Sequence, residues 1–461
     1  MSVIAAYMVP HPPMIVPSVG RGDESRVELT VRSYEKAAEE IASLKPDTII
    51  ISSPHSIMYS DYFHISPGRH AVGSFASFNA PDVSFSEDYD EELVDEICTL
   101  ADKIDFPAGT LGQKDSRLDH GTMVPLYFIR KKLSSCKIVR LGLSGLPLTD
   151  HYRFGQLIKE AVDNLNRRVV YIASGDLSHK LQTYGPYGFA PEGPEYDKRI
   201  MDVCGRAAFG ELFDFNEGFL SKAAECGHKS FVIMAGAFDG ISVKATEYSH
   251  EDVTGVGYGI CSFIPQSSDH TRHFLNTYLD KLDAELKEKR EQSDEYVRLA
   301  RQTIETYIKE RKIISVPDSV SKELLTKKAG AFVSIHKQGA LRGCIGTILP
   351  TKANIAEEII GNAISASTTD PRFDPITPDE LPWLDINVDI LSEPEDISSP
   401  DMLDVKKYGV IVTSGYKRGL LLPDLDGVDS IEQQISIAMK KGGIGEHEKY
   451  SLQRFEVIRH V

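Results

Sequence analysis

Short apolar runs alternate with longer amphipathic stretches along the first 265 residues. The short runs are rich in β-branched and aromatic residues, as strands are, and the longer stretches place apolar residues every three or four positions, as one face of a helix does. Because strands alternating with helices form parallel sheets covered on both faces, we predict an α/β domain with a mostly parallel or mixed sheet flanked by helices. The predicted strands are 3–9, 47–53, 137–143, 167–174 and 255–263, and the predicted helices are 24–44, 90–104 and 151–166.

A polar helical pattern separates this region from the rest of the chain. Residues 266–310 combine dense mixed charge with apolar residues at helical spacing, which is typical of a solvated helical region rather than a core segment. Beyond it, strand-like runs joined by short turns, followed by a helical stretch, predict an α+β domain with antiparallel pairing. We therefore predict a first domain over 1–265, a helical connector over 266–299 and a second domain over 300–461.

Charge and cysteine usage narrow the function classes. The 461 residues include 51 Lys and Arg against 68 Asp and Glu, a net charge of −17, which repels nucleic acid and anionic membranes. No apolar run reaches the roughly 18 residues that span a bilayer, and the first residues lack the basic region of a secretory signal. The six cysteines include no CxxC pair, which indicates reduced thiols. We expect a cytoplasmic protein that binds neither nucleic acid nor membranes.

Three predicted strands are each followed by a histidine. His11 comes just after the first strand, His55 after the second and His179 after the strand that ends at residue 174. The carboxyl ends of parallel strands form the edge at which open α/β sheets bind ligands. A single histidine at such a place is more often a hydrogen-bonded loop residue than a ligand. Three at equivalent places have no structural reason and indicate a binding site.

Two polar segments that precede apolar runs add further candidates. One contains His120 and the other contains the pair Glu225 and Cys226. Two histidines with one carboxylate form the facial arrangement typical of non-heme Fe(II), so His11, His55 and Glu225 are the predicted ligands. Cys226 is either a buried small hydrophobe or the third ligand in place of Glu225, because a thiolate also binds Fe, Zn and Cu.

The remaining histidines of this set suit proton transfer. His179 and His120 would be free for that role, which fits a side chain with an ordinary pKa near 6.5. On spacing alone, His120 is equally well a turn residue before a helix. Glu225 has a similar alternative as a solvated carboxylate at a helix start, where the helix dipole favours it.

The ordered motifs of the first region resemble those of the class III extradiol ring-cleavage dioxygenases of the LigB type, whose fold the Memo proteins share. The motifs are PHPP, SPHS, LDHGTMVPL, SGDLSH and ECGHKSFVIMAGAF. The resemblance implies an Fe(II) protein that cleaves a catechol-like aromatic substrate with O2, with Zn or Cu as alternative metals. It implies Fe(II) ligation by His11, His55 and Glu225, acid/base catalysis by His179, and His120 near the substrate hydroxyls.

The third ligand and the reaction have alternatives within this resemblance. Dioxygenases of this class hold a carboxylate at the third position, whereas Memo proteins hold a cysteine, and Glu225 and Cys226 offer both. Asp176 either orients His179 or lines the site. The alternatives to ring cleavage are a Memo-like metal-binding or redox accessory protein and a metal hydrolase in which zinc-bound water replaces O2.

The second region resembles the AMMECR domain family through LRGCIG, DPRF and RGLLLP. This resemblance implies a fold but no reaction. Cys344 beside Arg342 is either a thiolate stabilised by the guanidinium or a buried cysteine between glycines that allow tight packing. Asp370, Arg372 and Arg418 either line a cleft around Cys344 or pair among themselves.

The pairing of the two regions resembles the fused protein of the AmmeMemoRadiSam system, in which such domains accompany a radical-SAM enzyme. It implies a radical-SAM partner protein beside a small aromatic or metal-chelating substrate. Related folds often dimerise, so a homodimer is among the expected states.

Overall fold

The computed structural model describes residues 3–425 and 427–461. The chain divides into two compact units, Met1–Tyr278 and Leu279–Val461. Helix α9 (Phe274–Gln292) contains the point in the sequence at which the first unit ends and the second begins.

The first unit is built on a six-stranded sheet with the order β7-β2-β8-β1-β10-β9. The strands β7, β2, β8 and β1 are parallel, and β10 and β9 continue the sheet in antiparallel fashion. The predicted mostly parallel, mixed sheet is therefore confirmed. The strands are β1 (Val3–Val9), β2 (Thr48–Ser53), β7 (Lys137–Gly142), β8 (Val169–Ser174), β9 (Ile241–Glu251) and β10 (Tyr258–Ser268).

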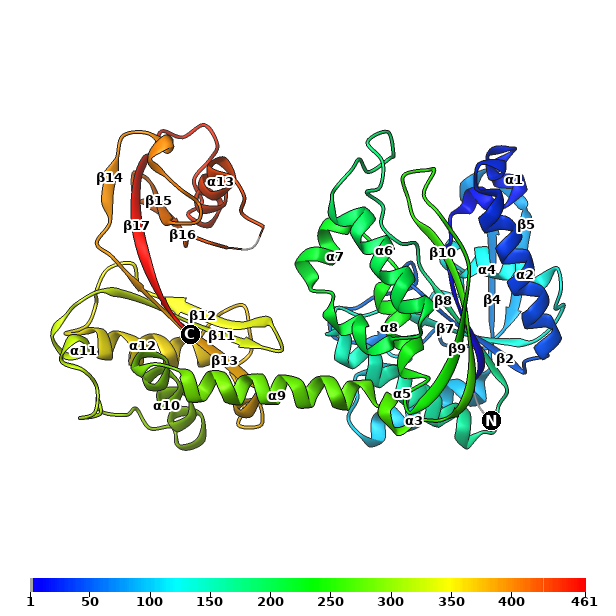
Figure 1. Cartoon of the computed structure of the whole chain (residues 1–461), viewed down its shortest axis with the longest axis horizontal. Helices are drawn as coiled ribbons and strands as arrows, with labels where there is room; N and C mark the ends of the chain where they lie inside the picture. The colour runs from blue at the N-terminus through cyan, green and yellow to red at the C-terminus, as the bar shows by residue number, and fades with distance from the viewer. Residues whose placement is uncertain (1–2, 426) are drawn as a thin grey trace. The chain divides into compact units, whose positions relative to one another are not determined.

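Helices cover both faces of this sheet (Figure 1). Successive side chains of a strand point to opposite faces, so Tyr7 of β1 packs in the core beneath α2 and α4 while Met8 contacts Cys204 of α6 on the other face. The covering helices are α2 (Glu28–Leu44), α3 (Glu91–Lys103), α4 (His120–Arg130), α5 (Leu148–Asn164), α6 (Glu192–Gly205), α7 (Glu217–Ala223) and α8 (His228–Gly236), and the short α1 (Pro17–Gly20) precedes them.

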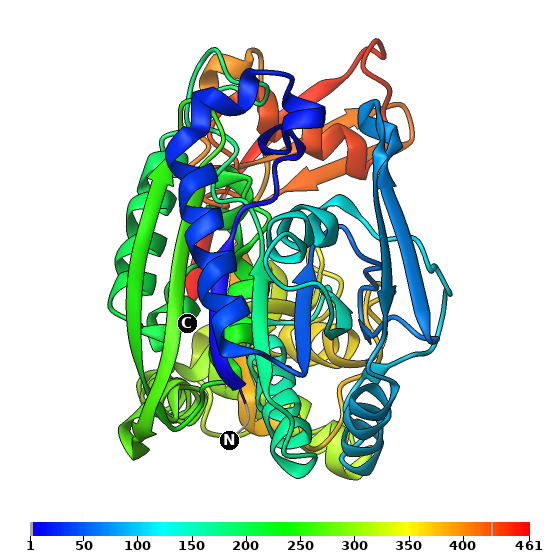
Figure 2. The ribbon, with the colours of Figure 1, turned by 90° about the vertical axis from the view of Figure 1, so that its right-hand side faces the viewer.

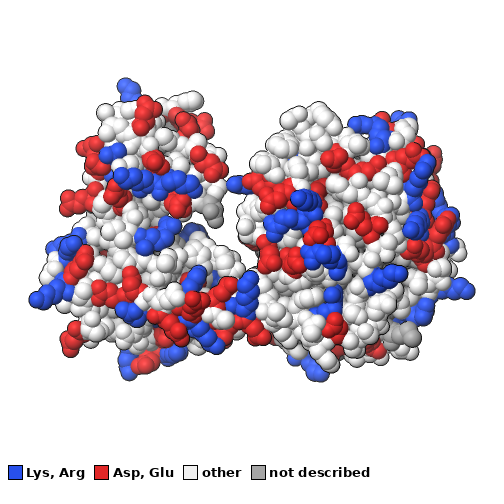
Figure 3. All heavy atoms as spheres, viewed as in Figure 1, with Lys and Arg blue, Asp and Glu red and all other residues white. Residues whose placement is uncertain are grey.

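A separate two-stranded ribbon formed by β4 (His70–Phe75) and β5 (Ala80–Asp88) stands beside the main sheet (Figure 2). A second short pair joins β3 (Phe63–His64) and β6 (Ala108–Gly109). Acidic and basic side chains are intermixed on the face shown in Figure 3. Within the described parts of the chain, no helix combines the length and the apolar character needed to cross a membrane.

The second unit is an antiparallel seven-stranded sheet covered by helices, which confirms the predicted α+β class. Its strands follow the order β12-β11-β13-β17-β15-β16, and β14 pairs with β17. The strands are β11 (Gly330–Lys337), β12 (Ala340–Gly346), β13 (Leu384–Leu391), β14 (Glu395–Ile397), β15 (Tyr408–Ser414), β16 (Lys417–Leu421) and β17 (Ser451–His460), and the helices are α10 (Glu295–Glu310), α11 (Lys322–Thr326), α12 (Ile355–Thr368) and α13 (Ile431–Lys441).

Helix α10 corrects the prediction of a solvated helical region over 266–310. Val297, Leu299, Ala300 and Ile304 are buried in the core that α10 shares with α12 and β13. Their spacing of one to four residues gives a single apolar stripe, which the dense charge on the other faces of the helix concealed in the sequence. Only the α9 part of the predicted region is mostly solvated.

Candidate metal centre

The three strand-end histidines converge because their strands are neighbours. In the sheet, β2 and β1 lie on either side of β8, so His55, His11 and His179 all follow the carboxyl ends of adjacent parallel strands. Nε2 of His55 lies 3.0 Å from Nε2 of His11. The sheet edge thus brings together the side chains that the sequence pattern predicted at it.

Cys226 completes a group of donor atoms with these two histidines. Its Sγ lies 3.6 Å from Nε2 of His11, and the backbone N–H of Asp176 donates to the same sulfur at 3.2 Å. The backbone of the loop after β8 is in contact with the backbone of the loop before α8. The contact is so close that a Cβ on Gly175 would lie only 2.0 Å from Cα of Gly227. Glycine at both positions lets Cys226 reach the end of the central strand.

Glu225 is engaged elsewhere. Its Oε2 accepts a hydrogen bond of 2.6 Å from the backbone N–H of His228, the first residue of α8. A helix start has unpaired N–H groups and a positive dipole end, so a carboxylate is stabilised there. Among the described residues, neither of the two groups with metal-binding spacing contains Glu225, and one of them consists of His11, His55 and Cys226. The geometry therefore favours the cysteine alternative for the third position.

The hydrogen bonds of Ser174 set the tautomer of His11. The Ser174 hydroxyl donates its only proton to the carbonyl of Gly121 at 2.6 Å. Its oxygen must therefore accept from Nδ1–H of His11, which lies 2.9 Å away. The lone pair of the neutral ring is then on Nε2, the atom that faces His55 and Cys226. Such a partner behind a histidine is typical of metal sites.

The donor set fits a metal ion. Two nitrogens at about 2.1 Å from one ion lie about 3.0 to 3.4 Å apart when the bond angle is between 90° and tetrahedral. The two Nε2 atoms meet this spacing at 3.0 Å. A nitrogen and a sulfur at about 2.1 and 2.3 Å from one ion lie about 3.1 to 3.6 Å apart, and the observed separation is 3.6 Å. Imidazole and thiolate together suit Fe, Zn and Cu.

His120 and His179 lie around this group. His120 is the first residue of α4, which Asp119 caps, and its ring centroid lies 3.9 Å from that of His55. Nε2 of His179 is 4.0 Å from Oδ2 of Asp176, and the ring stacks on Tyr187 at 5.0 Å. Within residues 3–425 and 427–461, the buried Nε2 of His179 has no hydrogen-bond partner.

Burial sets the protonation of the centre. It lowers the pKa of His120 and of His179 to about 4, with help from the nearby His55, and it lowers the pKa of His11 well below 6.5. Burial also raises the pKa of the Cys226 thiol, and the neighbouring Asp176 adds to this. The imidazoles are therefore neutral, as metal ligands must be, and the thiol needs a nearby cation in order to ionise.

Sequence reasoning missed the side chains that hold the ligands. The Ser53 hydroxyl donates to Asp119 at 2.6 Å and accepts the backbone N–H of His55 at 3.2 Å, so it links the turn at His55 to the start of α4. Ser53 and Ser174 are the last residues of β2 and β8. Their place at strand ends just before the histidine motifs is the signal that could have found them.

A cavity of about 870 Å³ adjoins the centre. His55 and His120 form part of its wall, and Phe78, Leu118 and Met123 add apolar surface. The ring of Phe78 meets that of His120 edge to face at 5.6 Å. Asp115, Arg117 and Arg140 also line the cavity, so its wall combines apolar and charged side chains.

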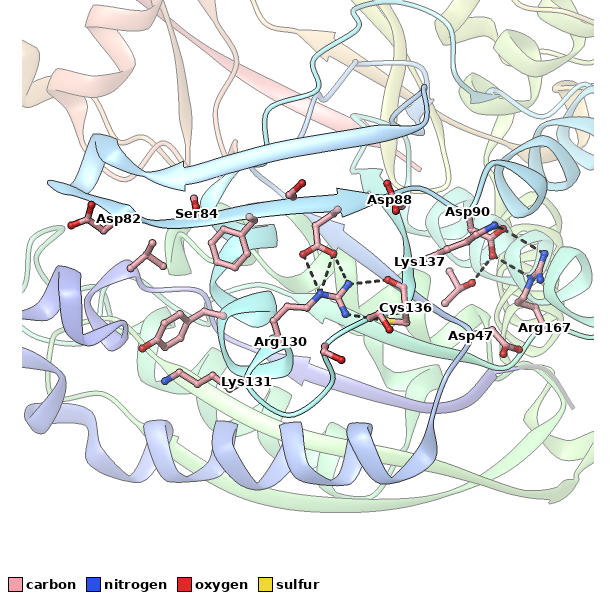
Figure 4. Close-up of a pocket in the computed structure, with 18 residues that line it drawn as sticks. Asp47, Asp82, Ser84, Asp88, Asp90, Arg130, Lys131, Cys136, Lys137 and Arg167 are labelled. Carbon is pink, nitrogen blue, oxygen red and sulfur yellow. Dashed lines mark hydrogen bonds and ion pairs between the residues drawn. The ribbon is translucent and has the colours of Figure 1, made fainter.

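A second cavity, of about 920 Å³, lies away from the histidines, where β2 and β7 begin (Figure 4). Its two arginines are paired with carboxylates. Arg130 donates to both carboxylate oxygens of Glu87 at 3.1 Å, and Arg167 lies 3.2 Å from Asp90. Although this cavity is the larger, its arginines are already compensated by carboxylates, so we place the site at the histidine cavity.

In the second unit, Asp370 and Arg372 come together around Cys344. The backbone N–H of Cys344 donates to Asp370 at 2.9 Å, and Arg372 donates to the carbonyl of Cys344 at 3.0 Å. Arg372 also pairs with Asp370 at 2.7 Å. The thiol accepts from Ser334 at 3.2 Å and is partly exposed. The charged pair thus holds the backbone of this residue, and the thiol is partly exposed rather than buried as one of the two alternatives predicted.

The two other arginines predicted near Cys344 lie elsewhere. Arg342 pairs with both oxygens of Glu380 at 2.9 Å, because a bulge in β12 at this residue changes the direction of its side chain. Arg418 is exposed and donates to Gln453 at 2.9 Å. The predicted stabilisation of the thiolate by Arg342 is therefore wrong. Gly343 does serve close packing, since a Cβ there would lie 2.2 Å from a backbone carbonyl oxygen of α12.

Comparison with known proteins divides the chain in a similar way. Residues 5–261 match the family described as the catalytic LigB subunit of aromatic ring-opening dioxygenase, and residues 297–460 match the AMMECR1 family. A Clostridium acetobutylicum protein is 41% identical over 473 residues, which cover 100% of this chain and 99% of that protein. A Thermotoga maritima protein is 53% identical over 167 residues, 36% of this chain and 96% of its own. A crystal structure of a Pyrococcus horikoshii protein covers 36% of this chain and 88% of its own at 32% identity, with a TM-score of 0.34. The chain therefore belongs to the LigB family of aromatic ring-opening dioxygenase subunits, with an AMMECR1 domain fused after it.

Proposed function

We propose that the first unit is an Fe(II)-dependent dioxygenase that opens the ring of a small aromatic diol. The observation that carries this proposal is the cavity of about 870 Å³ whose wall includes both His55 and His120. Fe(II) held by His11, His55 and Cys226 would supply the open positions at which a chelating diol and O2 meet. Membership of the LigB family supports the same reaction class.

The cavity wall suits a flat ring with polar groups at one end. Phe78 and Met123 offer apolar contact to the ring, while His120 and His55 lie at the end where the diol oxygens would bind. A mostly apolar pocket with a few convergent polar groups is the usual form of a small-molecule site.

Proton transfer falls to the two histidines outside the ligand set. Nε2 of His179 is buried without a partner among the described residues, so it is free to take a proton from a diol hydroxyl and to return it later. His120 lies against His55, where it can hydrogen-bond the second hydroxyl.

The test is O2 uptake by the full chain, purified without O2 and loaded with Fe(II), against a panel of catechols. We expect one O2 consumed per diol, and His179→Gln should slow turnover by about 10²- to 10⁴-fold. His70→Gln, in an exposed histidine paired with Asp88 on the hairpin, is the matched control and should turn over normally. An iron-loaded chain that consumes no O2 with any catechol would contradict the proposal.

A second candidate function follows from Cys226. A thiolate in the third position changes the charge and redox behaviour of the centre compared with a carboxylate, and the geometry favours Cys226 there. On this alternative, the unit is a metal-binding redox accessory protein for a radical-SAM partner and cleaves no ring. It predicts tight metal binding without O2 uptake in the same experiment.

A further inference from the structure

A second group of metal-binding donors shares Cys226 with the first. Asp176, His179 and Cys226 each offer one donor atom, and the three atoms lie within 4.8 Å of one another. Oδ1 of Asp176 accepts the backbone N–H of His11 at 2.7 Å, whereas Oδ2 lies 4.0 Å from Nε2 of His179, too far for a hydrogen bond. The side chains of Asp176, His179 and Cys226 thus lie close together, but the carboxylate and the imidazole form no hydrogen bond with each other.

This group lacks a positive charge. Asp176 is only 8% exposed, and within the described ranges its nearest ion-pair partner is His179 at 4.0 Å. A buried carboxylate is costly unless a cation or several hydrogen bonds compensate it. One cation would satisfy Oδ2 of Asp176, the unpartnered Nε2 of His179 and the sulfur together.

We infer that Asp176, His179 and Cys226 form a second metal position, adjacent to the first and sharing the Cys226 sulfur with it. Two ligand atoms held at about 2.1 Å from one ion lie about 3.4 Å apart at a tetrahedral angle, so Oδ2 and Nε2, which lie 4.0 Å apart, need to approach by about 0.6 Å to share one ion. A mixed set of carboxylate, imidazole and thiolate is one that Zn²⁺ accepts.

Occupation of this position has a functional consequence. An ion in this position binds Nε2 of His179, the atom that the proposed function uses for proton transfer. The second ion should therefore inhibit turnover, whereas the first ion supports it. This consequence rests on the proposed function, whereas the number of ions bound does not.

The experiment counts ions on the full chain under reducing, O2-free conditions. Zn²⁺ is the probe, buffered low enough to leave two-ligand surface pairs such as His70 and Asp88 empty, and bound metal is measured by mass spectrometry after equilibrium dialysis. We expect two equivalents for the parent chain and for the control His70→Gln. We expect one equivalent for Asp176→Asn combined with His179→Gln, and one for His55→Gln, which weakens only the first position. Asn at 176 keeps an oxygen for the N–H of His11.

A parent chain that saturates at one equivalent overturns the inference, and so does a double variant that still binds two. Circular dichroism and melting establish that each variant folds. If the double variant does not fold, Asp176→Asn alone is decisive, because it should weaken the second equivalent at least about tenfold and leave the first unchanged. Two equivalents without O2 uptake would support the second position and contradict the dioxygenase.

Discussion

Each unit holds a cysteine among polar side chains, Cys226 in the first and Cys344 in the second. The polar groups around these two cysteines differ in how they are paired. Near Cys226, Nε2 of His11 lies 3.6 Å from the sulfur and 3.0 Å from Nε2 of His55, and no ion pair among the described residues includes any of these three side chains. Around Cys344 the charged groups are paired, since Arg372 binds Asp370 and the carboxylate binds the backbone of the cysteine. The first arrangement is incomplete without a ligand, and the second is complete without one.

The pKa values of Asp176 and Asp370 differ in the same way as the surroundings of the two cysteines. Burial raises the pKa of Asp176 in the first unit to about 7. In the second unit, hydrogen bonds from Arg372 lower the pKa of Asp370 well below its usual range. A polar group left unsatisfied costs free energy and is retained where it serves a ligand, whereas a satisfied pair serves the fold.

The largest expected effect is on metal binding at Cys226. Cys226→Ala should lower the affinity for Fe(II) or Zn²⁺ by more than about 100-fold, beyond the loss typical of residues that only orient ligands. Glu225→Ala should keep the metal and only lose the hydrogen bond at the start of α8, about 1 kcal/mol of stability. Metal content after O2-free dialysis measures the first effect, and thermal melting the second.

The opposite pattern would reverse the assignment of the third ligand. If Glu225→Ala lost the metal and Cys226→Ala retained it, the carboxylate would be the ligand, and the resemblance to ring-cleaving enzymes would become closer. Equal losses in both variants would show that this loop acts as one unit.

The next effect tests the tautomer of His11. Ser174→Ala removes the acceptor for Nδ1–H, so we expect a 10- to 100-fold loss of metal affinity, measured by competition with a chelator. Ser230→Ala is the matched control, because it also removes a buried hydroxyl that donates to a carbonyl but contacts no candidate ligand. Equal affinities of the two variants would mean that Ser174 supports the fold only.

The sequence was sufficient for five of the six strands in the sheet of the first unit, because these five are largely continuous apolar runs. The edge strand β9 went unpredicted, because most of its residues are only partly buried. The strand predicted over 3–9 is the observed β1, and the histidines after β1, β2 and β8 meet because those strands are neighbours. The hairpin of β4 and β5 went unpredicted. Its strands are half exposed and packed by tertiary contacts, so no strong apolar period marks them.

The sequence could not decide between Glu225 and Cys226. Adjacent residues point in different directions, and which of them faces the histidines depends on the contact between Gly175 and Gly227, which lie far apart in the chain. The direction of Arg342 was concealed in the same way, because a bulge leaves no mark in the sequence. Residue types at a site can be predicted locally, whereas side-chain directions are set by long-range packing.

The third effect tests whether the Cys344 cluster is structural. Asp370→Ala removes the partner of Arg372 and the acceptor of the Cys344 N–H, so the second unit should lose about 2 kcal/mol of unfolding free energy. Trp383, the only tryptophan, lies in this unit, so its fluorescence during urea unfolding reports on this unit alone. Metal content should not change. A loss of metal without a loss of stability would contradict the contrast drawn between the two units.

The smallest effect is a pH dependence of the second unit alone. Burial would raise the pKa of Glu380, but hydrogen bonds from Arg342, the Thr377 backbone and Lys337 outweigh it and lower the pKa to about 2. Because folding favours the ionised form, the stabilisation is fully present above about pH 4.5, the ordinary value, and is lost as the pH falls toward 2. Glu380→Gln should therefore destabilise the unit at pH 6 and lose less stability than the parent between pH 4.5 and 2. Urea unfolding followed by Trp383 fluorescence at each pH measures this difference. Parallel pH profiles for the parent and the variant would show that Glu380 is not held in its charged form, and that the pairing of charges in this unit is weaker than the contacts indicate.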